Sequence, residues 1–423
     1  MVRKFSTSAE ADGNDAVVMF GSLSLLRCFA GKGIAVTAVD SDPQSLSLRS
    51  RYCAGRQIIA CPRNDPDAAV RDLVNVAKQI GGRPLLAFDN DPMLLLVSRH
   101  REILAPYYRF LLPAADLVED LVGKLRFVGM AERLGLPTPK SMIPTGATTI
   151  EEIVQRIGLP CILKPNSHLG KFRGVVESEL HRPHKVFRVD TIEELRHRYS
   201  QMRLYCDAFI VQECIAGDDD QLYSFHAYYD HNSRLTGCFV GRKIRTYPKD
   251  TGFSTCLELI HNHEIVDLGL SIMARMKFVG PMKLDFKRDA ARKQYLLLEC
   301  NPRFNLWHYL GAACGINLPM MAYADLRGET VTPVTHYRTS RRWLAFGNDF
   351  RAFMREYRPS GALTWPRYLW SLRHRAVHDV FAWRDPAPWC VCMGQYLGAN
   401  WRKLRRRLGR NANVVAPVPA PAD

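Results

Sequence analysis

The sequence predicts a protein of mixed α/β and α+β class, in which a domain built on a parallel sheet precedes a larger domain rich in antiparallel strands. Short apolar strands alternate with helices from residue 16 to about residue 115, which is typical of a parallel sheet covered on both faces. Between residues 209 and 300 most strands follow one another directly, which favours a mixed or antiparallel sheet. With 423 residues the chain is long enough to bury several cores.

The composition favours an intracellular protein without a bilayer-spanning segment. The apolar run of residues 16–20 is too short for the core of a signal peptide, and Arg or Lys interrupts every longer apolar window. The 12 Cys residues are scattered, and the close pair Cys390 and Cys392 is spaced too tightly for a usual zinc site. We therefore expect free thiols in a reducing compartment, and a cytoplasmic protein.

The first domain is expected over residues 16–115, after a flexible leader of residues 1–15. Residues 16–20 predict a strand, residues 21–33 a turn and a helix, and residues 34–42 a second strand, which together make a βαβ unit. The pattern continues with a strand at 56–61, a helix at 65–82, a strand at 84–91 and a helix at 93–108. The first turn lacks the G-x-G-x-x-G spacing that lets a backbone approach a pyrophosphate, so the domain is expected to be Rossmann-like without a dinucleotide.

The second domain is expected over residues 116–330, with a smaller lid at about 140–210. It opens with a helix over 116–135, and Pro137 and Pro139 then force an extended segment. In the lid, Thr191 is expected to cap a helix, with Glu194 three residues on. Strands are expected at 161–165, 184–189, 209–215, 222–230, 235–244, about 254–260, 281–289 and 294–300, with a helix at 263–280.

The last part of the chain, from residue 331, has a different composition. It holds 16 Lys and Arg against 5 Asp and Glu, and six of the seven Trp residues. We expect a basic, mainly helical extension over 331–410 and a disordered tail over 411–423. Leu397, Trp401, Leu404 and Leu408 fall on one face of a helix over 396–410, with arginines on the other. Such a helix suits an anionic membrane surface, and docking on the protein is an equal alternative.

The strongest chemical signal lies in residues 281–305. Glu299 and Asn301 are two apart on one strand, so they share a face, and pairing with the preceding strand brings Asp285 beside them. Carboxylate and amide oxygens are the hard ligands that Mg²⁺ prefers when it holds nucleotide phosphates. The alternative, a solvated acidic sheet face, is disfavoured because acids inside apolar strands are costly to bury unpaired.

Basic residues near these strands suggest phosphate contacts. Arg303 follows Asn301 on the same face and could grip a phosphoryl group, or it could pair with Glu299. Lys164 ends an apolar strand directly before a Pro and a flexible loop, where its ammonium can reach phosphates. Lys124 is a weaker candidate because surface lysines are common on helices.

A third signal is the strand at 209–215 and the acidic turn that follows. A strand that runs into a linker can offer backbone groups to an adenine edge, and the acids after it can accept hydrogen bonds from ribose hydroxyls. For any single Asp in the turn, a solvated position is an equal interpretation.

The order of these residues, Lys164, Gln212–Glu213, Asp285, Glu299, Asn301 and Arg303, resembles the ATP-grasp superfamily over roughly residues 16–330. The most specific piece is residues 298–305, which look like the superfamily's E-x-N-x-R metal-binding strand. The resemblance is greatest to carboxylate–amine ligases of the D-aspartate ligase kind, and more distant to carbamoyl-phosphate synthetase and biotin carboxylase. It implies a Rossmann-like domain followed by a two-part ATP-grasp fold that encloses ATP between two sheets.

The resemblance also implies a role for each matching residue. Asp285, Glu299 and Asn301 would hold a pair of Mg²⁺ ions, with Mn²⁺ as a substitute, and Arg303 would orient an acyl phosphate. ATP would contact Lys124 and Lys164 through its phosphates, Gln212, Glu213 and Cys214 through adenine, and Asp220 through ribose. The basic strand segment adds Arg242, Lys243 and Arg245 near the γ-phosphate and the substrate carboxylate.

Two departures from the family pattern affect the lid and the metal site. The loop over 166–174 has fewer glycines than that of biotin carboxylase, so His168 and Lys171 are expected to help cover the phosphates. Position 285 is Asp where several relatives have Glu, which shortens the reach of the carboxylate but keeps its charge.

The expected activity is ATP-dependent joining of a small-molecule carboxylate to an amine through an acyl phosphate, releasing ADP and phosphate. One alternative is a catalytically inactive nucleotide-binding or membrane-surface scaffold. Another is nucleic-acid binding, suggested by the formal charge of +16, but no recognisable nucleic-acid module accompanies that charge. The basic C-terminal helix leaves a peripheral position at the inner membrane face as a further alternative, and the sequence does not indicate the oligomeric state.

Overall fold

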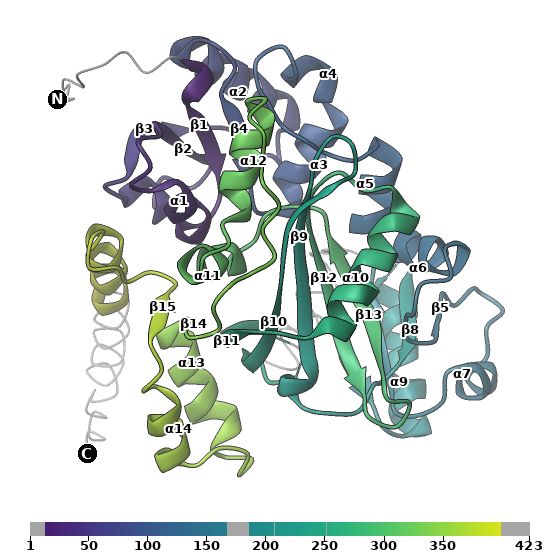
Figure 1. Ribbon diagram of the computed structural model, residues 1–423. Helices are drawn as coiled ribbons and strands as arrows, with labels where there is room; N and C mark the ends of the chain where they lie inside the picture. The colour runs from purple at the N-terminus through teal and green to yellow at the C-terminus, as the bar shows by residue number, and fades with distance from the viewer. Residues whose placement is uncertain (1–12, 167–185, 207, 251, 399–423) are drawn as a thin grey trace, which may run out of the picture.

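The computed structural model describes residues 13–166, 186–206, 208–250 and 252–398, and these residues form three β-sheets (Figure 1). The predicted loop residues His168 and Lys171, the tail 411–423 and most of the predicted helix over 396–410 lie outside them. Among the described residues, no helix is both long enough and apolar enough to cross a bilayer. The mixed α/β class is confirmed.

The N-terminal sheet is parallel throughout, as its alternating strands and helices predict. Its strands run in the order β3-β2-β1-β4. They are β1 (Val17–Phe20), β2 (Val36–Asp40), β3 (Cys53–Ile58) and β4 (Leu85–Phe88), and the helices are α1 (Leu23–Phe29), α2 (Pro66–Ile80), α3 (Asp91–Arg99) and α4 (Arg101–Leu104). Val17 and Met19 pack into one core and Val18 and Phe20 into another, so both faces of the sheet are covered.

Hydrogen bonds join the segment after β4 to the turn between β1 and α1, where a dinucleotide-binding domain has a glycine-rich loop. Asp89, just after β4, accepts hydrogen bonds from the backbone N–H of Ser22 at 2.9 Å and from its hydroxyl at 2.5 Å. Ser22 also caps α1. Asp40, at the end of β2, accepts from the backbone N–H of Asp42 at 2.9 Å, as an Asp in a turn commonly does.

A small antiparallel sheet follows the linking helices α5 (Ala115–Val122) and α6 (Lys124–Arg133). Its order is β5-β8-β6-β7. The strands are β5 (Ser141–Met142), β6 (Cys161–Pro165), β7 (Phe187–Val189) and β8 (Phe209–Glu213), packed with α7 (Ile150–Arg156) and α9 (Ile192–Tyr205). The hydroxyl of Thr191 accepts from the N–H of Glu194 at 3.2 Å, so the predicted helix cap is confirmed.

The largest sheet has seven strands in the order β13-β12-β9-β10-β11-β14-β15. They are β9 (Leu222–Tyr229), β10 (Leu235–Tyr247), β11 (Phe253–Ile260), β12 (Gly280–Asp289), β13 (Gln294–Asn301), β14 (Arg342–Leu344) and β15 (Ala376–His378). Helix α10 (His263–Met276) packs on one face. Helices α11 (Trp307–Cys314) and α12 (Leu318–Leu326) pack on the other and join it to the N-terminal sheet in one core (Figure 1).

The described part of the C-terminal extension combines helices with two short strands that its composition did not suggest. β14 pairs antiparallel with β11, and β15 pairs parallel with β14, so the extension completes the large sheet. The π-helical turn η4 (Phe353–Tyr357) and helices α13 (Phe346–Ala352) and α14 (Trp365–Ser371) lie between these strands, and residues 387–398 are helical. Strands of three residues leave almost no periodic signal, which is why the sequence did not reveal them.

Candidate active site

Four polar side chains share one face of β12 and β13. Asp285 lies opposite Glu299, and Lys283 lies opposite Asn301, in the antiparallel register of the two strands. Opposite residues point to the same face, and so do residues two apart on a strand. This face is the one opposite α10, whose core contacts come from Leu284 and the neighbouring apolar residues. The predicted grouping of Asp285, Glu299 and Asn301 is thus confirmed in its geometry.

Asp285 is buried and already neutralised by a neighbour. The ammonium of Lys283 lies 2.7 Å from its Oδ2, and the hydroxyl of Ser224 on β9 donates to its Oδ1. Burial alone would raise the pKa of Asp285, but Lys283 and Lys243 together hold it below its usual value. The carboxylate is therefore charged at neutral pH and ready to bind a cation.

Glu299 is the exposed acid of the group. Among the described residues its carboxylate forms no hydrogen bond and no ion pair, so it is open to a ligand. Within the same residues no three side chains of His, Cys, Asp and Glu type gather as a metal cage. Two carboxylates and the Asn301 oxygen instead fit Mg²⁺ that takes its remaining ligands from phosphates and water.

Arg303 joins this face to the N-terminal domain. Its guanidinium donates to Asn301 Oδ1 at 3.0 Å, to Asp91 Oδ1 at 2.5 Å and to the carbonyl oxygens of Asp89 and Phe304 at 3.1 and 3.3 Å. Four of the five N–H donors of an arginine are thus used. Arg303 is placed beside the proposed metal ligands as expected, but its main partners are protein groups.

Lys164 and Lys124 approach from the small sheet and from α6. The ammonium of Lys164 donates to Gln212 Oε1 at 2.6 Å, and that of Lys124 donates to the carbonyl of Pro165 at 3.0 Å. Burial lowers the pKa of Lys164 to about 8 and lowers that of Lys124, while the charge of Glu299 opposes both shifts. The charge of Glu299 on the large sheet thus acts on both Lys164 of β6 and Lys124 of α6.

The expected adenine-binding side chains are largely occupied by protein contacts. Glu213 is buried, its carboxylate pairs with Arg292 in the β12–β13 turn, and it accepts from the Lys140 N–H at 2.8 Å. Gln212 donates to the Ser141 hydroxyl at 2.8 Å. The backbone N–H of Cys214 bonds to the carbonyl of Pro160 at 3.1 Å. The carboxylate of Glu213 therefore accepts hydrogen bonds from protein groups, and its contact with adenine stays a prediction.

In the acidic turn, the structure separates a solvated acid from a buried one. Asp220 is exposed, and among the described residues only its neighbour Gln221 donates to it, at 3.1 Å. Asp219 is 2% exposed and accepts from Thr246 and from the Tyr357 hydroxyl, so it ties the turn η3 (Asp219–Gln221) to β10 and η4. Asp220 is therefore open to a ligand, whereas Asp219 is not.

The basic strand β10 divides its residues between two faces. Burial lowers the pKa of Lys243, with Asp285 and Glu299 opposing, and its ammonium forms no hydrogen bond among the described residues. Arg245 is instead buried against Asp349, with two contacts of 2.8 Å, and it also donates to Ser371. Register shifts on either side of Arg245 break the alternation of β10. The guanidinium of Arg245 is thus occupied by protein contacts, and a catalytic role for it stays a prediction. Arg242 pairs with Glu258.

Several residues of this site were missed from sequence. Lys283 could have been found, because it lies two residues before Asp285 and must share its face. Ser224 could not, because its position beside Asp285 depends on the pairing of β9 with β12. Asp91 likewise meets Arg303 only through the packing of the N-terminal domain.

Two histidines continue the same sheet face beyond Lys283. His226 on β9 lies opposite Lys283, and His308 on α11 contacts it edge to face with ring centroids 5.5 Å apart. Both are fully buried. The backbone N–H of Asn305 donates to Nδ1 of His308, and the side-chain amide of Asn305 forms a hydrogen bond with Nδ1 of His226. Burial lowers the pKa of His308 to about 3 and that of His226 far below its usual value, so both rings are neutral.

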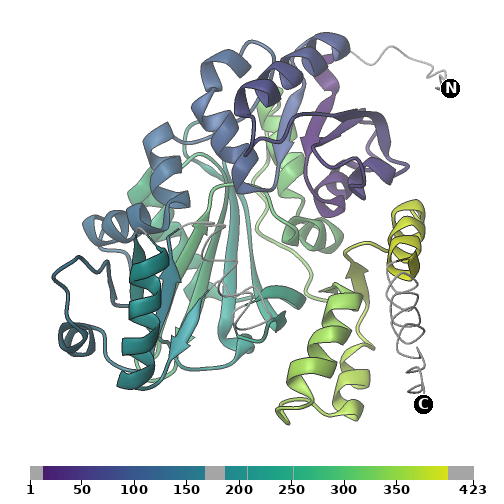
Figure 2. The same ribbon diagram turned by 180° about the vertical axis from the view of Figure 1, so that it is seen from behind.

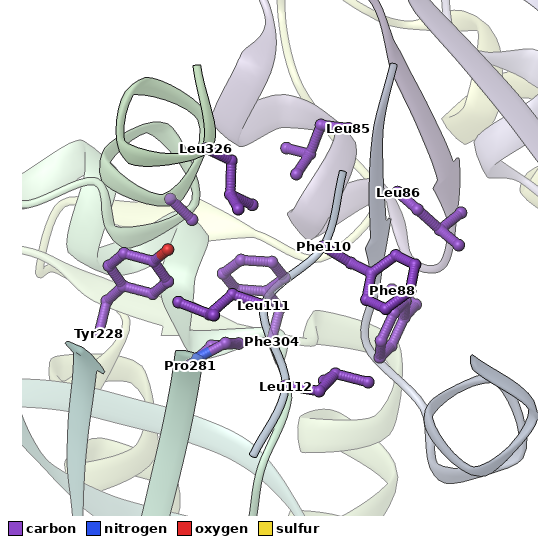
Figure 3. Close-up of a pocket in the computed structure, with 11 residues that line it drawn as sticks. Leu85, Leu86, Phe88, Phe110, Leu111, Leu112, Tyr228, Pro281, Phe304 and Leu326 are labelled. Carbon is purple, nitrogen blue, oxygen red and sulfur yellow. The ribbon is translucent and has the colours of Figure 1, made fainter. Parts of the chain in front are cut away.

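An apolar crevice lies away from this polar face, between β4 and the ends of β9 and β12 (Figure 3). Leu86, Phe110, Tyr228 and Phe304 are among its lining residues. Its volume is about 20 Å³, room for about one water molecule. It is too small for a substrate and lacks charged groups, so we assign no chemistry to it.

No family model matches the chain. It is 24% identical over 250 residues to the D-aspartate ligase of Enterococcus faecium, covering 57% of this chain and 58% of that protein. It is 21% identical over 242 residues to the carbamoyl phosphate synthase large chain of Clostridium acetobutylicum, covering 55% and 21%. The matched region therefore spans less than two thirds of either relative.

Solved structures share the fold over a larger part of the chain. The N5-carboxyaminoimidazole synthetase of Staphylococcus aureus, solved with ADP, has a TM-score of 0.58 at 13% identity and covers 79% of this chain and 82% of that one. The L-amino acid ligase of Bacillus licheniformis has a TM-score of 0.56 at 14% identity and covers 78% of each chain. These matches confirm the predicted resemblance to ATP-grasp carboxylate–amine ligases, whose fold this chain has.

Proposed function

We propose that this chain is an ATP-dependent ligase that joins a carboxylate to an amine through an acyl phosphate. The observation that supports it most is the opposition of two charged groups: Lys164 and Lys124 on one side, and the charged pair Asp285 and Glu299 on the other. Cations suit phosphates and acids suit magnesium, so a magnesium nucleotide satisfies both sides at once.

ATP would lie between the small sheet and the large one. Lys164 and Lys124 would contact its phosphates, and Lys243 would reach the γ-phosphate from β10. Because the Cys214 N–H and the Glu213 carboxylate have protein partners, adenine would rest against the backbone that follows Cys214. Asp220, exposed at the turn after that linker, would accept from a ribose hydroxyl.

Asp285, Glu299 and Asn301 would hold Mg²⁺, either as one ion or as a pair. When bound there, the metal would neutralise phosphate charge as it develops. The ammonium of Lys283 now contacts Oδ2 of Asp285. For Asp285 to bind the metal through that oxygen, the ammonium would have to turn toward an anionic group such as a phosphate. The flexible four-carbon stem of a lysine allows that movement.

The reaction has two balanced steps. A carboxylate oxygen of the first substrate attacks the γ-phosphorus, the bond to the bridging oxygen breaks, and ADP leaves. The amine nitrogen of the second substrate then attacks the acyl carbon, phosphate leaves, and the nitrogen loses a proton. The protein residues contribute by positioning and by charge, with Lys243, Lys283 and the remaining N–H of Arg303 facing the transferred phosphoryl group.

The substrate class follows from this chemistry and from the relatives. The Enterococcus faecium relative is a D-aspartate ligase, and one structural neighbour is an L-amino acid ligase. We therefore propose amino acids as the first class to screen, in both configurations, as carboxylate and as amine donors.

The test is release of ADP across a matrix of amino-acid pairs with Mg²⁺ present. Glu299→Gln keeps the size of the side chain but removes a charged ligand, so ADP release should fall on the order of 100-fold. Glu264→Gln is the matched control, because Glu264 is an exposed acid on α10 at the opposite face of the sheet.

Full ADP release by Glu299→Gln would remove the metal assignment. ATP binding without ADP release for any pair would point to a nucleotide-binding scaffold instead.

A further inference from the structure

Exposed apolar side chains gather in the C-terminal extension. The described residues include 15 large hydrophobic side chains that are exposed, and nine of them lie between residues 346 and 397. The nine are Phe346, Phe350, Trp365, Leu369, Trp370, Trp383, Trp389, Tyr396 and Leu397. This stretch therefore holds more than half of the exposed large hydrophobic side chains of the described residues, which makes it a candidate surface for a partner.

The exposed rings of α14 are mounted on a rigid base. Tyr368, in the middle of α14, is buried and stacks on Phe353 with ring centroids 4.1 Å apart. Trp365 packs edge to face on Phe353 at 4.8 Å. This anchoring leaves Leu369 and Trp370 pointing away from the core, with 57% and 62% of their surfaces exposed. A helix held in this way can present apolar side chains without collapsing over them.

The exposed charge of the extension is mainly positive, because two of its acids form buried ion pairs. Asp349 pairs with Arg245 of β10, and Asp385 pairs with Arg27 of α1, both in buried contacts. The cations that neutralise these acids therefore come from outside the extension. Eight of its own arginines are exposed and form no ion pair with an acid among the described residues: Arg338, Arg351, Arg355, Arg358, Arg367, Arg373, Arg375 and Arg384.

The extension also lies on its own side of the molecule. In both views α13, α14 and residues 387–398 lie on the side of the molecule away from the small sheet of β5, β6, β7 and β8 (Figures 1 and 2). A flat partner could approach these elements without contacting the small sheet, which in our proposed function covers ATP. Docking of a partner on the extension would thus leave the proposed ATP site uncovered, so docking and turnover can be measured separately.

We propose that the C-terminal extension docks on an anionic lipid surface. Its Trp and Leu side chains enter the interfacial layer, and its arginines bind lipid phosphates. Trp is favoured at the boundary between headgroups and acyl chains, and each basic residue near an anionic leaflet adds to binding. Exposed aliphatic side chains such as Leu369 distinguish this surface from one for nucleic acid, where bases stack on aromatic rings and aliphatic groups have no comparable partner.

The test is flotation of the full chain with vesicles, independent of nucleotide and of turnover. The vesicles contain either phosphatidylcholine alone or phosphatidylcholine mixed with phosphatidylglycerol. The wild type should float with the mixed vesicles, less with the neutral ones, and less at high salt. Replacing Trp370 and Trp383 together with Ser should lower partitioning about 10-fold or more, because each indole buries apolar surface in the interface.

Two further variants serve as a control for loss of an exposed apolar side chain and as a test of the electrostatic contribution. Leu204→Ser removes a side chain that is 76% exposed on α9, outside the extension, and should float like the wild type. Arg367→Gln with Arg373→Gln should reduce binding to mixed vesicles and leave the weak binding to neutral ones unchanged. All variants should keep their melting temperature, since the altered side chains lie on the surface.

The proposal is overturned if the wild type does not float, or if the Trp double variant floats as well as the wild type. It is also overturned if only truncation before Asn400 abolishes flotation while the Trp variant retains it, because the lipid contact would then lie beyond the described surface. A wild type that binds a single-stranded RNA probe but no vesicles would make the surface a nucleic-acid site.

Discussion

At the scale of single residues, Lys164 combines burial with a proposed phosphate contact. Burial lowers its pKa to about 8, although the nearby Glu299 opposes this. The ammonium therefore loses its proton as the pH rises through about 8, and with it the attraction for phosphate. We predict that the affinity of the wild type for ATP falls above about pH 8, whereas Lys164→Arg binds ATP with little change there, because a guanidinium keeps its charge.

Titration calorimetry of ATP binding between about pH 7 and about pH 9.5 measures this difference. Lys32→Arg, at an exposed position of the N-terminal domain, should follow the wild-type curve. Parallel curves for the wild type and Lys164→Arg would show that Lys164 does not contribute to the pH dependence.

The buried histidine pair makes stability depend on pH in a defined direction. Burial lowers the pKa of His308 to about 3, while the unfolded chain has an ordinary imidazole near pH 6.5. The unfolded state thus binds a proton that the folded state excludes, and stability falls as the pH drops from about 6.5 toward about 3. We predict a shallower fall for His308→Gln than for the wild type in urea unfolding.

His263→Gln is the control for this experiment, because His263 is exposed at the start of α10. It should leave the slope of stability against pH unchanged. Equal slopes for the wild type and His308→Gln would mean that His308 titrates normally in the folded protein.

Alternation along strands explains how much of the site could be predicted residue by residue. It placed Asp285, Glu299 and Asn301 on one face, and it would have added Lys283. The resemblance implied a place near the γ-phosphate for Arg245, and the register shifts that turn this side chain toward Asp349 leave no sign in the sequence. The resemblance implied an adenine contact for Glu213, and its ion pair with Arg292 had no local signal because Arg292 is 79 residues away along the chain.

At the scale of elements, the buried pair of Arg245 and Asp349 ties β10 to α13. Their side chains are 4% and 0% exposed, so removing one charge leaves the other buried and unpaired. We predict that Asp349→Asn lowers the free energy of unfolding by about 3 to 5 kcal/mol, and that Arg245→Met combined with Asp349→Leu recovers much of the loss.

Urea unfolding measures both variants. The surface pair of Arg99 and Glu119 gives the comparison, since Arg99 is 58% exposed and Glu119→Gln should cost only about 1 kcal/mol or less. An equally small effect of Asp349→Asn would mean that the extension is not held by this pair.

Elements with a clear period were predicted well and short ones were not. The strands at Val17–Phe20 and Cys161–Pro165 and the helix after Thr191 follow from apolar runs and a capping residue. β3 begins three residues before its predicted start at residue 56. Helix α7 and the strands β14 and β15 were missed, because seven and three residues give too little pattern to distinguish from loop.

At the scale of the whole molecule, the sequence predicted the order of a parallel sheet, a small sheet and a large sheet, and the comparisons confirm the ATP-grasp fold that this order implies. It did not predict that the extension completes the large sheet. That arrangement depends on contacts such as Arg27 with Asp385, which join α1 to a segment more than 350 residues later. Contacts between residues so far apart along the chain leave no local pattern in the sequence.

The central claim is that a carboxylate becomes an acyl phosphate on this chain. It can be tested with ¹⁸O in both oxygens of the carboxylate substrate found by the ADP-release screen. We predict that the inorganic phosphate released with the amide contains one ¹⁸O atom per turnover, because a carboxylate oxygen bonds to the γ-phosphorus and leaves with it. Phosphate without ¹⁸O, formed together with ADP and amide, would contradict the acyl-phosphate mechanism.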